Sequence, residues 1–456
     1  WTIRSDFDRL QLDGVPRQLV AAASVSFAGL RSTYRRDGFG AELVVVMEAP
    51  PLAVPVDGAG PVAAPVFSEM PAINATALLR FGGGTLDEVL ATREIRLEAW
   101  SPDTTTSLRL EGQEVPLAAN FTAAYGLWMA QSGFATESLR TLFGRGEGIR
   151  EPHIYLMQPY DPDRRIIFML HGLASSPEAW VNLANEIMGD PEMRRHYQIW
   201  SVYYPTNAPI ALNRYTVSNA FNRTLDHFDP GRTAAATHDM VFIGHSMGGV
   251  IARLMLSESG DTLWNGAVER FNLRGERLRR VEARLGPLAR FSPQPDVGRA
   301  IFIASPHRGT DIAGNRLGRL IGKLVRLPLT ILGKFEDVFL AMQDVEPSAD
   351  TSKPPRIGNS IDNLKATDPF ISASSALPMA PGLKYHSVIA RRKADMPLEA
   401  SDDGLVPYWS AHLDGALSEK VILSGHSVQE TPEAVLEVRR ILRQDLRMHG
   451  GGTDHR

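Results

Sequence analysis

Cysteine is absent from all 456 residues of the chain. The protein therefore has no disulfide, no thiolate metal site and no cysteine nucleophile. An excess of positive charge is also missing: the formal net charge is -4, which argues against broad nucleic-acid binding, because such proteins usually show a strongly basic balance. No stretch of about 18 or more apolar residues appears, so we expect no membrane span within these residues.

The composition, with 43% hydrophobic and 22% charged residues, is that of an ordinary globular protein. The length allows roughly two or three domains. The chain begins at Trp1 rather than methionine, which indicates a processed or truncated form in which an upstream signal peptide would not be visible. Residues 448–456 are glycine-rich and polar, and we expect a disordered tail there.

The chain changes in texture near residue 150. Residues 1–150 contain strand-like stretches such as "AELVVVMEAPPLAVPV", broken by proline and glycine, which predicts a strand-rich accessory region. Over residues 151–447, short apolar runs such as "RRIIFMLHG" and "DMVFIG" alternate with helical patterns. Fully apolar strands interleaved with helices predict an α/β fold with a mostly parallel sheet covered on both faces.

Two insertions interrupt this alternation, at about residues 258–296 and 312–380. The second contains apolar and basic residues that form separate stripes at helical spacing: Leu317, Leu320, Ile321 and Leu324, and Arg316, Arg319, Lys323 and Arg326. One interpretation is a helix packed on the body with solvated cations. The alternative is a mobile lid over an apolar pocket, with the basic segment 312–335 touching anionic membrane lipids.

The stretch "GHSMGG" follows the apolar run "MVFI" directly. Gly244, Ser246 and Gly248 match the Gly-x-Ser-x-Gly nucleophile elbow, in which a strained strand-to-helix turn exposes the serine. Small residues are needed because side chains two positions from the serine would collide with neighbouring backbone. The alternative, an inert glycine-rich turn, is disfavoured by the strand before it and the helix after it.

A serine nucleophile needs a base, and histidine is suited because its pKa lies near neutrality. Of the 12 histidines, His426 in "SGHSVQETPEA" follows the last predicted strand, which places it at the same sheet edge as Ser246. His386 lies inside a strand and is expected to be a packed residue. His245 belongs to the elbow but points away in most such turns, and His307 comes too early for the chain order serine, acid, histidine.

The third member should be a carboxylate that orients the imidazole. "ASDDGLVPYWSA" offers Asp402 and Asp403, after the strand that contains His386 and before the strand that leads to His426. Asp403 is preferred because it directly precedes Gly404, which suits a tight turn, and Asp402 stays open. Without the serine and histidine, two solvated loop aspartates would be the default interpretation.

An acyl-transfer site also needs donors for the oxyanion. One donor should be the backbone N–H after the nucleophile, which belongs to Met247. The second should come from the loop after an earlier strand. In "MLHGLASS", His171 and Gly172 end an apolar run, so Leu173 would offer its N–H. The alternative is a simple turn at the end of a strand.

With these motifs in their observed order, the sequence resembles the α/β-hydrolase lipases and esterases. "HGLASS", "GHSMGGVIAR", "ASPHRGTD", "SDDGLVPYWSA" and "SGHSVQETPEA" occur in the order seen in bacterial lipases and related GPI inositol-deacylase-like hydrolases, over about residues 152–447. The resemblance implies an α/β-hydrolase fold, with a cap or lid after "PHRGTD". It also implies a catalytic triad and an oxyanion hole at these residues: Ser246, Asp403 and His426, and Leu173 and Met247. The first 150 residues have no counterpart in compact lipases.

The expected reaction is hydrolysis of carboxylic esters with apolar acyl groups through an acyl-enzyme. An acyltransferase with the same triad is the nearest alternative, and a non-catalytic binding protein on a hydrolase scaffold is the other. We expect no cofactor and no metal ion, since no oxygen-ligand cluster for the structural calcium of some bacterial lipases stands out. The expected partner is a small-molecule or lipid ester. The resemblance, the non-methionine start and the lack of cysteine favour a bacterial exported, periplasmic or membrane-associated protein.

Overall fold

The computed structural model describes residues 2–10, 12, 15–48, 65–132, 151–310 and 360–450. The basic amphipathic segment predicted at 312–335 and most of the second insertion lie outside these residues. The same holds for residues 451–456 of the predicted tail, whereas helix α16 (Pro432–Gly450) continues through residues 448–450.

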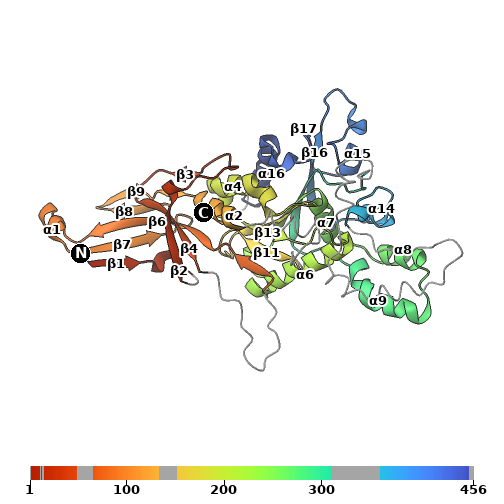
Figure 1. Cartoon of the computed structure of the whole chain (residues 1–456), viewed down its shortest axis with the longest axis horizontal. Helices are drawn as coiled ribbons and strands as arrows, with labels where there is room; N and C mark the ends of the chain where they lie inside the picture. Colours follow the sequence, from red (N-terminus) through yellow and green to blue (C-terminus); the bar gives the residue numbers. More distant parts are fainter. Residues whose placement is uncertain are drawn as a thin grey trace.

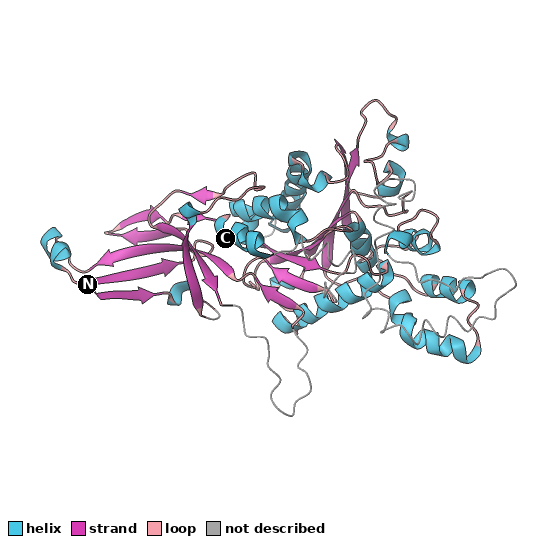
Figure 2. Ribbon diagram, viewed as in Figure 1, coloured by secondary structure: helices cyan, strands magenta, loops and turns pink. Residues whose placement is uncertain are grey.

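An eight-stranded sheet forms the centre of the larger part of the molecule, in the order β17-β16-β15-β14-β12-β13-β11-β5 (Figures 1 and 2). Neighbouring strands run parallel except for β11, which is antiparallel to β13. The mostly parallel sheet predicted from the sequence is therefore confirmed. The strand bounds are β5 (Phe67–Glu69), β11 (His153–Leu156), β12 (Arg165–Leu170), β13 (Tyr197–Tyr203), β14 (Met240–His245), β15 (Val297–Ile303), β16 (Lys384–Arg391) and β17 (Ser418–Leu423).

Strand β12 shows why these apolar runs become central strands. Its side chains alternate between two cores: Ile166 and Phe168 pack in one, and Ile167 and Met169 in the other. Successive side chains of a strand point to opposite faces, so a strand buried on both faces must be apolar throughout. Helices α6 (Ile210–Phe228) and α7 (Met247–Met255) contribute to the first core, and α4 (Val181–Gly189) and α16 to the second.

The strand-rich N-terminal region forms a separate five-stranded sheet, in the order β1-β7-β6-β4-β2. Its strands pair antiparallel except for β1 with β7. The bounds are β1 (Thr2–Asp6), β2 (Pro16–Ala21), β4 (Ala41–Met47), β6 (Ala72–Phe81) and β7 (Glu94–Trp100), with short helix α1 (Leu86–Ala91) between the last two. Smaller pairings join β3 (Arg35–Arg36) to β10 (Ala119–Asn120) and β8 (Ser107–Leu110) to β9 (Gln113–Pro116).

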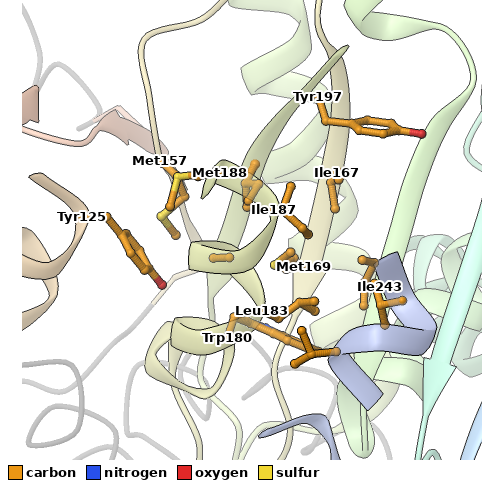
Figure 3. Packing of buried hydrophobic residues seen from close by; sticks show 14 of the residues in the cluster. Tyr125, Met157, Ile167, Met169, Trp180, Leu183, Ile187, Met188, Tyr197 and Ile243 are labelled. Carbon is orange, nitrogen blue, oxygen red and sulfur yellow. The ribbon is translucent and has the colours of Figure 1, made fainter. Parts of the chain in front are cut away.

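Residues from both parts of the molecule belong to one buried hydrophobic cluster. Tyr125 and Trp128 of helix α2 (Ala123–Ser132) belong to the same buried cluster as Ile187 and Met188 of α4, and Figure 3 shows Tyr125 beside that helix. Strand β5 falls within residues 1–150 but pairs with β11 of the large sheet. Residues on the N-terminal side of the predicted boundary at 150 and 151 thus take part in the central sheet. The division of the chain into two parts at that boundary stays a prediction.

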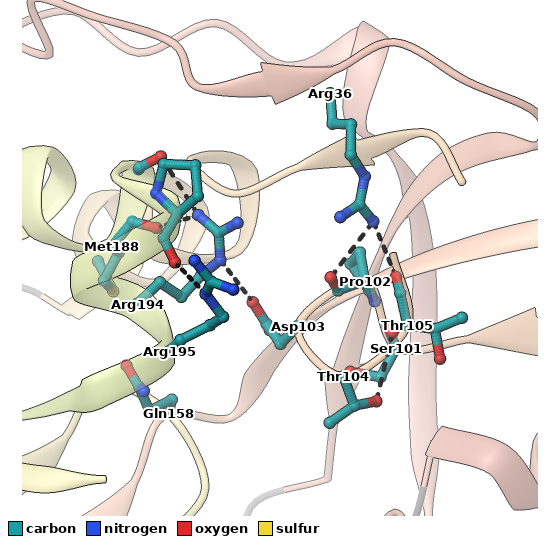
Figure 4. Close-up of polar contacts among 12 residues, drawn as sticks. Arg36, Ser101, Pro102, Asp103, Thr104, Thr105, Gln158, Met188, Arg194 and Arg195 are labelled. Carbon is teal, nitrogen blue, oxygen red and sulfur yellow. Dashed lines mark hydrogen bonds and ion pairs between the residues drawn. The ribbon is translucent and has the colours of Figure 1, made fainter. Parts of the chain in front are cut away.

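Arg194 of α5 (Pro191–His196) forms a polar contact between the two parts (Figure 4). Its guanidinium donates to the main-chain oxygen of Met188 at 2.7 Å, lies 3.7 Å from the Asp103 carboxylate and stacks over the ring of Phe121. Asp103 lies in the loop between β7 and β8, and Arg36 donates to Thr105 of that loop at 2.8 Å. A partly buried cation held by several acceptors fixes how the loop meets α5.

The first insertion, at 258–296, contains helices α8 (Thr262–Arg270) and α9 (Gly275–Ala289), which pack on each other through Trp264, Leu273 and Val281. Near the end of the second insertion lie α13 (Ser360–Asn363) and α14 (Pro369–Ser375), and α15 (Tyr408–Ala411) precedes β17. Among the helices in the described ranges, none is both long and apolar enough to cross a membrane.

Candidate active site

Ser246 occupies a strained turn between β14 and α7. Its φ of 54° and ψ of -128° lie in a region that side-chain-bearing residues rarely adopt, and such outliers cluster at functional sites. The surrounding glycines make the turn sterically possible. A Cβ atom on Gly244 would collide with the backbone of Gly249, and one on Gly248 would collide with the carbonyl oxygen of Leu170.

Ser246, His426 and Asp403 form a continuous hydrogen-bonded chain. Oγ of Ser246 lies 2.8 Å from Nε2 of His426, and Nδ1 of His426 lies 2.8 Å from Oδ2 of Asp403. The three residues follow β14, β17 and β16, and the carboxyl ends of these parallel strands meet at one edge of the sheet. With the Nδ1 proton donated to the carboxylate, the Nε2 lone pair is free to accept the serine proton.

The structure brings Asp403, not Asp402, to the histidine. Asp403 is only 1% exposed, and its Oδ1 accepts the N–H groups of Leu405 at 2.8 Å and Val406 at 2.7 Å. These bonds satisfy one carboxylate oxygen and aim the other at His426. The exposed side chain of Asp402 instead accepts the N–H of Gly404 at 2.6 Å, so it closes the turn.

The turn after β12 lies directly against the serine. A Cβ on Gly172 would lie 2.9 Å from Cβ and 3.4 Å from Oγ of Ser246, so the main chain of this turn approaches the serine closely. Leu173 follows in that turn. Met247 is the first residue of α7, where an N–H has no acceptor within its own helix. The role of Leu173 and Met247 as oxyanion donors stays a prediction.

Tyr204 supports this turn, and sequence reasoning missed it. Its hydroxyl donates to the main-chain oxygen of His171 at 2.5 Å, and its ring stacks on the His171 imidazole with centroids 4.6 Å apart. Burial lowers the pKa of His171 to about 4, so the ring is neutral near pH 7. The only signal in the sequence is a tyrosine in an apolar strand, which does not distinguish this role from packing.

The other histidines named from the sequence occupy different places. His386 lies in a buried network, with Nε2 2.6 Å from Arg299 and Nδ1 2.7 Å from the hydroxyl of Ser418. His307 is 1% exposed with its ring against Phe302, and burial lowers its pKa well below the usual value.

His245 contacts the loop that carries His426, although the sequence analysis expected its side chain to point away from the site. Its Nε2 lies 2.9 Å from the main-chain oxygen of His426. Within the described ranges, no group of three or more histidine or acidic side chains is placed to hold a metal ion.

Comparisons with known proteins give one family match and several distant structural likenesses. The alpha/beta hydrolase family model matches residues 167–438. Among solved structures, the mature Bacillus licheniformis lipase BlEst2 is 14% identical, with a TM-score of 0.37 over 64% of this chain and 97% of that chain. The Staphylococcus hyicus lipase is also 14% identical, with a TM-score of 0.37 over 65% and 98%. Esterase B of Lactobacillus rhamnosis is 10% identical, with a TM-score of 0.33 over 72% and 98%.

These structural likenesses are too distant to carry an argument, and no curated protein matches the chain. The family model is different, because it spans more than half of the 456 residues. Its range includes the serine, the aspartate and the histidine described above. The chain therefore belongs to the alpha/beta hydrolase family.

Proposed function

We propose that the protein is a serine hydrolase that cleaves carboxylic esters through an acyl-enzyme on Ser246. The observation that carries the proposal is the unbroken hydrogen-bonded chain from Ser246 through His426 to Asp403, with 2.8 Å at each step. A serine hydroxyl is a weak nucleophile until a base accepts its proton, and the base needs a third group to fix its tautomer.

In the proposed mechanism, Oγ of Ser246 attacks the ester carbonyl as its proton passes to Nε2 of His426. The Asp403 carboxylate stabilises the imidazolium, and the N–H groups of Leu173 and Met247 hold the oxyanion. His426 then gives the proton to the departing alkoxide, which leaves an ester on Ser246. Water, deprotonated by the same Nε2, attacks this ester and releases the acid, and the proton returns to Oγ.

An apolar acyl group is proposed because of the apolar stripe in the second insertion and the lipase-like motifs "SPHRGT" and "DGLVP". Contact of the 312–335 segment with anionic lipid, and a location outside the bacterial cytoplasm, belong to the same proposal. Each is an inference from residue pattern and resemblance.

An acyltransferase is the second candidate, because the same three residues would form the same acyl-enzyme and an alcohol would replace water in the second step. The side chain of His426 is 18% exposed, so the base is not sealed from solvent. Product analysis with added acceptor alcohols separates the two reactions: a hydrolase releases acid, and a transferase forms the new ester in preference to acid.

The test is hydrolysis of p-nitrophenyl esters from acetate to palmitate by the intact protein and by Ser246→Ala. We expect activity that rises with apolar acyl length and is lost in the variant. Ser24→Ala is the matched control, since it removes an exposed serine hydroxyl that donates to Ala21, and it should keep full activity. Ester hydrolysis that persists in Ser246→Ala would contradict the proposal.

A further inference from the structure

His245 links the strand that carries the nucleophile to the loop that carries the base. It is the last residue of β14 and directly precedes Ser246, and its Nε2 lies 2.9 Å from the main-chain oxygen of His426. In the sheet order, β15 and β16 lie between β14 and β17. Strands β14 and β17 are therefore not paired with each other, and the His245 hydrogen bond joins the end of β14 directly to the loop after β17.

The direction of this hydrogen bond fixes the tautomer of the His245 imidazole. A main-chain carbonyl only accepts, so Nε2 of His245 must carry the proton and Nδ1 must be bare. Among the residues that the structure describes, none hydrogen-bonds to the buried Nδ1, which agrees with this tautomer. Burial, with the neighbouring His426 ring as the second cause, lowers the pKa of His245 to about 3. The ring therefore stays neutral at working pH and is a donor, not a second base.

Packing holds the His245 ring in place on its other sides. His245 is 5% exposed, and its ring forms an edge-to-face contact with the fully buried Trp180, with centroids 6.4 Å apart at 89°. A Cβ on Gly172 would lie 3.3 Å from Nδ1, so the main chain of that turn also lies close to the ring. A ring confined in this way holds its hydrogen bond without losing further rotamer freedom.

The loop that it holds is short. His426 lies between the end of β17 at Leu423 and a 3-10 helix at Val428–Glu430, and Ser424 donates to the main-chain oxygen of Arg391 at 2.9 Å. The imidazole itself contacts Ser246 and Asp403 through its two nitrogens, but these contacts fix the ring and not the main chain beneath it. A displacement of that main chain would lengthen the proton-transfer distance to Oγ.

We propose that His245 is a positioning residue, which fixes the main chain of His426 so that its imidazole stays in line between Ser246 and Asp403. This inference rests on the proposed function. It predicts that loss of the His245 donor lowers kcat, because the catalytic proton transfer depends on that alignment, and leaves KM nearly unchanged, because the residue does not reach the substrate.

The experiment compares His245→Gln, His245→Asn and His245→Phe in p-nitrophenyl butyrate hydrolysis. The glutamine amide nitrogen can take the place of Nε2, the asparagine nitrogen that of Nδ1, and phenylalanine keeps the ring but has no donor. We expect Phe and Asn to lower kcat roughly tenfold, which corresponds to about 1.4 kcal/mol, with KM unchanged. The Gln variant should recover most of this loss.

The matched control is His153→Phe. His153 of β11 is a partly buried histidine that also forms a hydrogen bond through Nε2, 2.9 Å from the hydroxyl of Ser68, near the far edge of the same sheet. Its loss should leave kcat unchanged. Thermal unfolding of every variant shows that activity is compared between folded proteins.

Equal kcat in His245→Phe and the unaltered protein, or equal loss in the Phe and Gln variants, would overturn the positioning role. Either result would leave the proposed function standing if hydrolysis still depends on Ser246. If Ser246→Ala retains the activity, the proposed function itself fails, and the two failures are thus distinguished.

Discussion

Replacing Asp403 with asparagine should abolish the proposed ester hydrolysis by reversing the tautomer of His426. In the native carboxylate, Oδ1 accepts two main-chain N–H groups, from Leu405 and Val406, and Oδ2 accepts from Nδ1 of His426. An asparagine must direct its carbonyl oxygen to the two N–H donors, because an NH₂ group there would face them without an acceptor. Its NH₂ group is then left to face Nδ1.

Because this NH₂ group is a donor, Nδ1 of His426 must become the acceptor, and the ring proton moves to Nε2. A protonated Nε2 cannot take the proton of Ser246. Loss of the correct tautomer is expected to lower kcat by roughly 10⁴-fold, or about 5 kcal/mol of transition-state stabilisation. The assay is kcat for p-nitrophenyl butyrate, with thermal unfolding to confirm that Asp403→Asn folds.

Asp402→Asn is the matched control, because it makes the same chemical change one residue away on an exposed side chain whose partner is the N–H of Gly404. Its kcat should stay within about twofold of the unaltered protein. Activity above a small fraction in Asp403→Asn, or equally severe loss in Asp402→Asn, would refute a reversal of the His426 tautomer.

Two further predictions concern sterics and pH. In Gly172→Ala the new Cβ would lie 2.9 Å from Cβ of Ser246, so kcat should fall about 100-fold or more. The control is Gly266→Ala, where a Cβ meets open space and kcat should stay unchanged. Equal kcat in the two variants would contradict the close approach. Burial lowers the pKa of His171 and of His386 to about 4, so the unfolded chain binds more protons than the native state between about pH 6.5 and pH 4. The urea midpoint of unfolding should therefore fall as the pH falls through that window. A midpoint that stays flat or rises would contradict this prediction.

The strained turn at Ser246 could be predicted from the sequence because its determinants are local. An apolar run, a serine between small residues and a helix pattern all fall within residues 240–255, and steric demands act between neighbours in the chain. Asp403 and His426 followed from chain order and from the rule that parallel strands end at one sheet edge. The choice between Asp402 and Asp403 needed coordinates, since only the main-chain donors from Leu405 and Val406 decide which carboxylate turns inward.

The features that the sequence did not reveal depend on contacts between distant residues. Strand β5 has three residues in a proline-rich stretch, too few for a pattern, and only its pairing with β11 makes it part of the large sheet. Arginine side chains usually lie at the surface. Arg299 of β15 is instead fully buried, with Nε 2.8 Å from the carboxylate of Asp445 of α16. The bond from His245 to His426 joins residues whose encounter depends on the whole sheet.

The most direct test of the account is mass spectrometry of the protein quenched during turnover of p-nitrophenyl butyrate. Slow deacylation would be favoured by low temperature, and peptide mapping would locate any acyl group. The account predicts a butyryl ester on the peptide that contains Ser246, and no adduct in Ser246→Ala. Turnover with an acyl group on another residue, or turnover undiminished in Ser246→Ala, would contradict it.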